Sequence, residues 1–377
     1  MQLILSVAII VVLLSSMIVV LRWGNLKVSG PMPVSLFTFI AILFTSGLDV
    51  GLIMFPMTEF PIYETEPSYG FVNPLAFMFG TWGFLIWVFY FLTTFYFCIV
   101  EPKLKIFEIP IVKFINNIVI IGTCAFTGYL FLTYLPGYIE GITALFQYGL
   151  VAVVVLSAVL SSTHVRYVKI LSVTSTWVFF TLIAGMWFMS GMGFNGLGQN
   201  LALIGEYFTN LPKFVLPVSD YHAFYLFWWF AWSIMIGQFV ARFVGNLKTW
   251  QLLLSLLIFP SIPIALWFSV LYFYYNQGME ISPFFNAAMI FVGVVFVVNS
   301  LDSLTRLYTD NLNLTVHKLG LGRYIILNWG LLFGLILLYK FTPLKIEWIG
   351  LIVIGLYTIV YTIMVKRRKI LAAMQDA

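Results

Sequence analysis

Residues 225–248 of the chain read YLFWWFAWSIMIGQFVARFVGNLK. From Asp220 to Arg242 the sequence contains no other acidic residue, lysine or arginine. An apolar run of about 20 residues is long enough to cross a bilayer as a helix. About eleven stretches of this kind follow one another along the chain. They cover approximately residues 2–23, 33–57, 74–98, 111–134, 142–162, 168–190, 219–243, 250–275, 284–305, 322–340 and 345–366.

The composition places the chain among integral membrane proteins. Of its 377 residues 62% are hydrophobic and only 9% are charged, which a water-soluble globular protein of this length does not sustain. The formal net charge of +5 is explained by basic loops between the spans and calls for no nucleic-acid partner. We therefore expect an all-α protein of about eleven transmembrane helices.

The charges in the loops predict an orientation. Basic residues fall on alternate loops, at Arg22, Lys27, Lys103, Lys105, Arg166, Lys169, Arg242, Lys248, Lys318, Arg323 and 366–369. The opposite loops carry Glu59, Glu64, Glu66, Glu140, Glu206 and Glu280. Because basic loops stay on the cytoplasmic side, the N-terminus is expected outside and the C-terminus in the cytoplasm of a multi-pass inner (plasma) membrane protein. The basic cluster at 366–369 also suits contact with anionic lipid.

Six aromatic residues on two spans predict a ligand site. Trp82, Trp87 and Tyr90 cover about 140° of one helix face, and residues 228, 229 and 232, all tryptophan, cover about 100° of another. Aromatic faces turned toward one cavity form a box for a quaternary ammonium cation. The competing interpretation is a belt of interfacial tryptophans, but these residues lie inside long apolar runs.

Asp49 lies within the second span, between Gly47 and Gly51. An ionisable group inside a membrane is expensive and indicates a functional site. Two glycines beside it weaken the helix, and transporters often use helices broken at mid-membrane to expose backbone groups to substrate and ion.

Enzymatic signatures are missing from the sequence. Its three histidines lie far apart, and it has no HExxH motif, serine nucleophile elbow or phosphate-binding glycine loop. Cys98 and Cys124 fall on different spans and indicate neither a disulfide nor a metal site. The chain is predicted not to be an enzyme and to need no cofactor.

Several motifs give the chain a resemblance to the betaine/carnitine/choline transporter family. Residues 225–248 are similar to the family's signature helix, with a WWxxW core followed by FVAR. Residues 299–303 (NSLDS) resemble a T-S-x-D-S motif, and residues 33–57 are similar to the glycine-rich substrate helix, with Thr58 and Glu59 after it. The resemblance extends over nearly all of the chain.

The resemblance implies a LeuT-like fold of two inverted five-helix repeats. Its parts are expected at 1–30 (one leading helix and loop), 31–190 (first repeat), 191–218 (an external amphipathic helix at 196–212 and a linker), 219–366 (second repeat) and 367–377 (a short cytoplasmic tail). The family has two leading helices, so the first is missing here. The amphipathic helix implies a homotrimer. Ile234 replaces the proline that follows Trp-Ser in the signature, which predicts a milder break in that helix.

The family's ammonium box maps onto Trp82, Trp87, Tyr90 and Trp229, and its permeation path onto Trp228 and Trp232. Its second sodium site maps onto Gly47, Leu48, Phe296, Asn299 and Ser300, where an amide replaces one hydroxyl. A further proposed sodium site maps onto Thr123, Thr127 and Met235, although the methionine replaces an aromatic partner. Residues 123 and 127 are equally explained as threonines that bond back to their own helix. No metal other than sodium is implied.

The functional expectation is a secondary active transporter of quaternary ammonium solutes that works by sodium-coupled alternating access. Asp49 replaces a family glycine. Its carboxylate attracts a cation and repels a betaine carboxylate, which favours choline over glycine betaine, unless Asp49 binds the coupling cation instead. Proton-coupled or exchange transport of betaine- or carnitine-type solutes, a non-transporting receptor and a structural subunit remain as alternatives.

Overall fold

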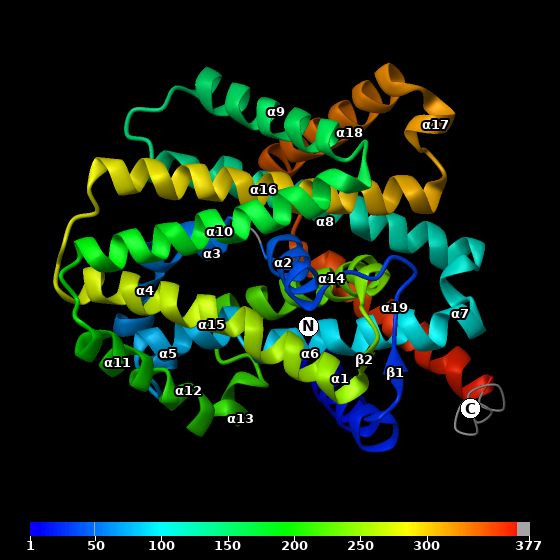
Figure 1. The fold of residues 1–377 in the computed structure, drawn as a ribbon, viewed down its shortest axis with the longest axis horizontal. Coiled ribbons are helices and arrows are strands. Elements are labelled where there is room, and N and C mark those ends of the chain that lie inside the picture. Colours follow the sequence, from blue (N-terminus) through cyan, green and yellow to red (C-terminus); the bar gives the residue numbers. More distant parts are fainter. Residues whose placement is uncertain (49, 368–377) are drawn as a thin grey trace.

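The structure, a computed structural model, describes residues 1–48 and 50–367 and consists almost entirely of helices. Figure 1 shows the long helices α10, α15 and α16 running lengthwise beside one another. In the described part, ten helical stretches are long and apolar enough to cross a membrane. They are α1 (Gln2–Trp23), α5 to α7 (Pro74–Trp82, Leu85–Phe95 and Glu101–Leu104), α8 (Pro110–Tyr134), α9 (Ala144–Ser161), α10 (Val165–Met189), α14 (Asp220–Val240), α15 (Thr249–Asn276), α16 (Pro283–Leu312), α18 (Leu321–Phe341) and α19 (Ile346–Lys366). The all-helical membrane fold is confirmed.

The eleventh predicted span, 33–57, is not one continuous helix. It is divided among α2 (Leu36–Gly47), α3 (Gly51–Met54) and α4 (Pro56–Thr65). The interruption falls where two glycines flank Asp49, as the sequence indicated. Pro56 begins α4, at a position where a helix tolerates its missing N–H.

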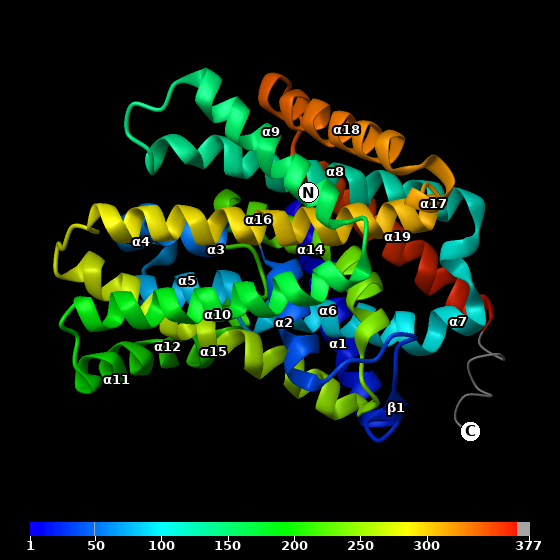
Figure 2. The same cartoon turned by 45° about the horizontal axis from the view of Figure 1, so that its top comes forward.

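The two ends of the bundle carry different elements. Figures 1 and 2 show α11 (Phe194–Leu203) and α12 (Gly205–Thr209) at one end, together with the α15–α16 loop. The opposite end carries β1 (Lys27–Val28), α7 and α17 (Val316–Leu319). The predicted basic loops gather at the β1 end and the acidic loops at the α11 end. Which end faces the cytoplasm stays a prediction.

A short antiparallel pair was not expected from the sequence. β1 pairs with β2 (Leu247–Lys248), and Lys27 lies opposite Lys248. The backbone N–H of Thr249 extends the contact by donating to the Leu26 carbonyl at 2.9 Å. The pair fastens the loop after α1 to the loop after α14.

The centre of the bundle is built around α14. This helix packs against α6 and α19, and nearly all of its side chains are buried. Gly237 permits close approach to α6, because a Cβ there would lie 2.1 Å from Thr93 Oγ1. The hydroxyl of Thr93 donates to the Ser233 carbonyl at 2.8 Å. A milder break was expected at Ser233 and Ile234, but α14 runs through both residues without interruption.

The segment expected as one amphipathic helix at 196–212 is divided into three. Ile204 separates α11 from α12, and Asn210 separates α12 from α13 (Leu211–Phe214), where Pro212 lies in the first turn. Glu206 anchors the segment by accepting from the Asn73 backbone N–H at 2.8 Å. The homotrimer, the inverted repeat and the boundaries of the repeats stay predictions.

Candidate functional site

The interruption between α2 and α3 brings aromatic rings close to backbone. α2 ends at Gly47, Leu48 is extended, and α3 begins at Gly51. A Cβ on Gly51 would lie 2.5 Å from the ring of Trp82, and one on Gly47 would lie 3.3 Å from the ring of Tyr90. The missing side chains therefore make room for two residues of the predicted box. Asp49 lies outside the described residues.

Side chains from other helices satisfy carbonyls on both sides of this interruption. The hydroxyl of Ser300 on α16 donates to the Leu48 carbonyl at 2.8 Å. The indole of Trp267 on α15 donates to the Leu52 carbonyl at 2.9 Å. Backbone carbonyls freed by a broken helix need such partners inside a membrane. The contacts hold the broken helix between the elements of the candidate site.

A second interruption, unexpected from the sequence, separates Trp82 from Trp87. α5 ends at Trp82, Phe84 has a positive φ of 46°, and α6 begins at Leu85. The backbone N–H groups of Phe84 and Leu85 donate to Ser261 Oγ (3.1 Å) and to Tyr207 OH (3.3 Å). These external acceptors replace intrahelical carbonyls at the start of α6. The predicted common helix face for residues 82, 87 and 90 is therefore wrong, because Trp82 belongs to a different helix.

Three of the six aromatic residues form one ring cluster. The centroid of Trp82 lies 5.6 Å from that of Trp228 and 5.1 Å from that of Trp229. Residues 228 and 229 stack nearly parallel, also at 5.1 Å. These separations mean direct ring contact. The rings therefore fill the space between them in this closed arrangement.

The other three aromatic residues occupy neighbouring positions. Trp87 and Tyr90 form an edge-to-face pair on α6 with centroids 5.3 Å apart, and both approach Gly47. The Tyr90 hydroxyl donates to the Gly47 carbonyl at 3.2 Å. Trp232 is fully buried one turn beyond Trp228 on α14. The broken helix thus lies against Trp82 at Gly51 and against the α6 pair at Gly47.

Four indole N–H groups of the predicted site have no acceptor among the described residues. They belong to Trp82, Trp87, Trp228 and Trp232, all fully buried. Only Trp229 is satisfied within the described site, by the Thr81 carbonyl at 2.7 Å. A buried donor without a partner costs about 1–3 kcal/mol. Four such donors near one broken helix indicate a place that takes up acceptor groups.

The residues mapped onto the second sodium site meet at the same broken helix. Ser300 Oγ lies within hydrogen-bond distance of the carbonyl oxygens of Leu48 (2.8 Å) and Thr45 (3.4 Å). The side-chain amide of Asn299 donates to Ser175 Oγ at 2.6 Å, while its buried Oδ1 has no donor in the described structure. Phe296 is fully buried one turn earlier on α16. Carbonyl, hydroxyl and amide oxygens are hard ligands that suit a sodium ion.

The residues mapped onto the further sodium site give a mixed result. Thr127 Oγ1 donates back to the Thr123 carbonyl at 3.4 Å, as the simpler explanation expected. The hydroxyl of Thr123 is buried and has no partner in the described part of the chain. Met235 is fully buried on α14. One oxygen of this set is therefore free to accept a ligand.

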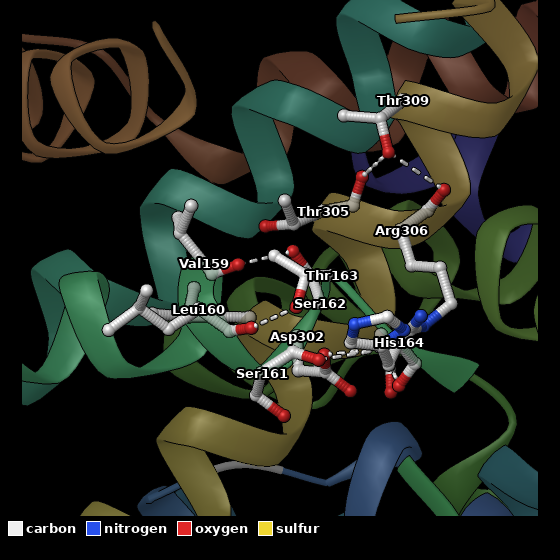
Figure 3. Close-up of polar contacts among 12 residues, drawn as sticks. Val159, Leu160, Ser161, Ser162, Thr163, His164, Asp302, Thr305, Arg306 and Thr309 are labelled. Atoms are coloured by element: carbon white, nitrogen blue, oxygen red, sulfur yellow. Dashed lines mark hydrogen bonds and ion pairs between the residues drawn. The ribbon is translucent and has the colours of Figure 1, made fainter. Parts of the chain in front are cut away.

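A buried ion pair joins α16 to the corner between α9 and α10 (Figure 3). Arg306 Nη2 donates to Asp302 Oδ1 at 2.9 Å and to the carbonyls of Ser161 and His164, each at 3.2 Å. Asp302 belongs to the motif that begins at Asn299. One guanidinium thus fixes the α9–α10 corner one turn beyond the candidate ion site.

Comparison with known proteins found two relatives, both transporters, and no family model matches the chain. One relative is the glycine betaine transporter OpuD of Bacillus subtilis (strain 168), 27% identical over 299 residues, which are 66% of this chain and 57% of that protein. The chain is thus distantly related to transporters of the betaine/carnitine/choline type. The other relative is a glycine betaine/proline/choline transporter of Vibrio parahaemolyticus, 28% identical over 99 residues, which are 23% of this chain and 18% of that protein.

This distant relationship agrees with a multi-pass membrane protein, and the homologues found are transporters and not enzymes. The chain spans about half the length of OpuD, the relative with the longer match. The activity of the whole relatives therefore comes to this chain as a proposal.

Two features of the structure were missed by reasoning from the sequence. Glu59 was assigned to a loop, but it is buried and accepts hydrogen bonds from three tyrosines. Tyr221 and Tyr225, four residues apart at the start of α14, were the available signal. The second feature is Arg306, four residues after Asp302 and therefore on the same helix face.

Proposed function

We propose that the protein is a secondary transporter of quaternary ammonium solutes and that its substrate binds where Trp82, Trp228 and Trp229 meet the broken helix α2–α3. Distant similarity to transporters of glycine betaine and choline supports transport of betaine- or choline-type solutes. Alternating access exposes this site first to one side of the membrane and then to the other.

The observation that carries the proposal is the set of four buried indole N–H groups that have no acceptor among residues 1–48 and 50–367. Their rings offer electron-rich faces for a trimethylammonium group, and their N–H edges offer donors for an oxygen of the same ligand. A quaternary ammonium compound with a hydroxyl or carboxylate uses both properties. Because the rings now touch one another, binding requires Trp82 to separate from the two tryptophans on α14.

Choline is the favoured substrate. Its hydroxyl oxygen can accept from an indole N–H, and its single positive charge suits a site beside Asp49. Glycine betaine brings a stronger acceptor, but its carboxylate is repelled by that of Asp49 unless a cation screens it.

Sodium is the favoured coupling ion, held by Leu48 O, Ser300 Oγ, Asn299 Oδ1 and Phe296 O. Bound there, sodium links substrate binding to the ion gradient by holding both sides of the broken helix. Thr123 and Thr127 are candidates for a further sodium ion. The proposal places the acidic α11 end outside the cell, and α11 to α13 on the surface of a homotrimer.

The test is uptake of labelled choline and labelled glycine betaine into proteoliposomes, each with and without an inward sodium gradient. We expect sodium-driven uptake of choline that greatly exceeds uptake of betaine. Trp229→Leu should abolish it, whereas Trp348→Leu, which alters an exposed tryptophan on α19, should leave it intact.

Each other outcome has a distinct meaning. If glycine betaine is transported and choline is not, the substrate preference is overturned and Asp49 is reassigned to ion binding. Uptake that ignores sodium overturns the ion assignment. If choline or betaine quenches tryptophan fluorescence but neither compound is transported in either direction across the membrane, the protein is a receptor and not a transporter.

A further inference from the structure

Glu59 on α4 lies in a cage of tyrosine hydroxyls. Tyr63, one turn later on the same helix, donates to Glu59 Oε2 at 2.8 Å. Tyr221 and Tyr225, one turn apart on α14, both donate to Oε1 through short hydrogen bonds. The glutamate is only 2% exposed. One carboxyl group therefore ties α4 to α14.

The cage has an unusual composition for a buried acid. Besides burial, the groups that influence the Glu59 carboxyl are the three hydroxyls that donate to it, all from tyrosines. The other titratable groups near it are also tyrosines, namely Tyr69 and Tyr138, with Tyr134 behind them. Buried carboxylates are normally paired with a cation. Here the described surroundings supply hydroxyl groups instead.

The other elements against α4 do not supply a cation to this site. α3 and α5 contain no titratable side chain, and Tyr275 on α15 donates to Glu64. His222, next to Tyr221, faces away: its Nδ1 accepts from the Val218 N–H, and its ring packs against Phe77. Within the described part of the chain, the charge of Glu59, when present, is thus balanced only by hydrogen bonds.

The cage is connected to the proposed substrate site through one shared ring. The ring of Tyr225 lies 5.7 Å from that of Trp82 and 5.7 Å from that of Trp228. The hydroxyl of Tyr225 binds Glu59, while its ring covers the tryptophan cluster. A movement between α4 and α14 at Glu59 therefore acts directly on Tyr225, a residue that touches the tryptophan cluster.

We propose that the Glu59 carboxyl is a proton-binding site, and that proton occupancy holds α4 against α14 and keeps the tryptophan cluster closed at this end. The inference rests on the proposed function for its role in transport, but the proton site can be measured without transport. The step is a simple protonation. One Oε–H bond forms with a proton from water on closing, and the proton returns to water on opening.

A tyrosine cage serves both forms of the carboxyl group. A tyrosine hydroxyl can donate to a carboxylate, or it can turn and accept from a protonated carboxyl. The cage can therefore hydrogen-bond the Glu59 carboxyl group in either state. The preference between the two forms is set by burial of the charge.

Burial raises the pKa of Glu59 to about 7, although the three hydrogen bonds oppose the shift. In an open, hydrated arrangement its pKa returns to about 4.3. At a pH between these two pKa values, Glu59 therefore takes up a proton when α4 closes against α14. Because the closed-state pKa is raised, the stabilisation of the closed state is complete below the ordinary pKa and is lost as pH rises through about 7.

The direct test is difference infrared spectroscopy of the purified full chain in lipid, which detects the carbonyl stretch of protonated carboxyl groups. We expect a band that disappears as pH rises through about 7. Glu59→Gln should remove the band. Glu64→Gln, which changes an exposed glutamate on the same helix, should retain it. A band that persists in Glu59→Gln, or one that does not titrate near neutral pH, overturns the proton site.

We call the proton-dependent contact between α4 and α14 the latch. It is tested by the distance between two spin labels, attached at Thr65→Cys on α4 and Asp220→Cys on α14. Cys98 and Cys124 are replaced by alanine so that only these two positions are labelled. We expect the separation to increase as pH rises in the parent and to stay short in Glu59→Gln, which imitates the protonated state. Tyr225→Phe removes a donor to the charged form and should raise the midpoint by about one pH unit.

The failure of this inference is distinguishable from failure of the proposed function. A titrating band with an unchanged label separation overturns the latch alone. If choline is transported but no infrared band titrates, the proposed function stands and the proposed proton site is overturned. Normal infrared and distance titrations without uptake or ligand binding leave the proton latch and overturn the transporter.

Discussion

Trp82 meets the face of Trp229 nearly at a right angle, with ring centroids 5.1 Å apart and an interplanar angle of 76°. The two residues belong to α5 and α14, which lie on opposite sides of the α11–α13 segment in the sequence. In the proposed substrate site, their contact closes the space that a quaternary ammonium group needs. Substrate binding therefore reports on the relative position of these two helices.

Replacement of Trp228 by phenylalanine separates the two properties assigned to the indoles. The variant keeps an aromatic face but loses an N–H donor that has no acceptor among the described residues. We expect choline affinity to fall about fivefold to tenfold, as for the loss of one hydrogen bond worth about 1 kcal/mol. Binding of tetramethylammonium, which has no acceptor oxygen, should stay unchanged. Tryptophan fluorescence titration measures both.

Two results contradict this assignment. Equal losses for both ligands show that the ring shape matters and the donor does not. Unchanged choline affinity shows that Trp228 donates to water or to nothing in the bound state. Trp348→Phe is the matched control, because that exposed indole lies on α19, outside the proposed site.

Replacement of Ser300 by alanine tests the proposed sodium site. The change removes a hydroxyl that contacts the carbonyls of Leu48 and Thr45 and leaves both with one partner fewer. We expect the sodium concentration for half-maximal choline uptake to rise about tenfold, with the maximal rate nearly kept. Ser157→Ala on the exposed surface of α9, where the hydroxyl bonds only to Val153 O, should change neither value. A purely structural role of Ser300 would lower the maximal rate without the sodium shift.

The interruption of the second span could be predicted from the sequence, whereas that between α5 and α6 could not. Gly47 and Gly51 around an acidic residue weaken a helix by local propensity. At the other interruption, Gly83 caps α5 but no proline or acidic residue accompanies it, and the positive φ falls on Phe84. Its backbone N–H is satisfied by Ser261, 177 residues later in the chain. Such a tertiary contact has no local signal.

Some site residues could likewise be predicted from local sequence, whereas others depend on tertiary contacts. The tryptophans were recognisable because their number and position are unusual for a membrane helix. Glu59 was not, because a glutamate two residues beyond an apolar run normally belongs to a solvated loop. Only folding brings Tyr221 and Tyr225 to it, across more than 160 residues of sequence. The grouping of Trp82 with α14 likewise depends on packing between helices.

Two glycine-to-alanine changes test the close packing of α14. At Gly237 a Cβ would lie 2.1 Å from Thr93 Oγ1 and 2.8 Å from its backbone carbonyl carbon, so α6 must move. We expect a loss of about 1–3 kcal/mol in the free energy of unfolding. At Gly334, on exposed α18, nothing lies within 4 Å, and alanine should be neutral or stabilise by up to about 1 kcal/mol. Thermal unfolding in detergent compares the two, and equal effects would contradict the packing.

The buried pair of Asp302 and Arg306 is expected to respond differently to single and double replacement. Arg306→Met leaves the Asp302 carboxylate buried without its cation and deprives the carbonyls of Ser161 and His164 of a donor. We expect a loss of about 3–5 kcal/mol in the free energy of unfolding, measured by denaturation in mixed micelles.

Asp302→Leu combined with Arg306→Met removes both charges and should recover a large part of that loss, because desolvating two charges offsets most of their attraction. Lys105→Met supplies the control. It breaks the exposed pair with Glu108, 3.9 Å apart, and should cost less than about 1 kcal/mol. A double variant as unstable as Arg306→Met would show that the guanidinium acts mainly through the carbonyls of the α9–α10 corner. The pair would then serve chiefly to hold that corner beside the candidate ion site, with Asp302 orienting the arginine.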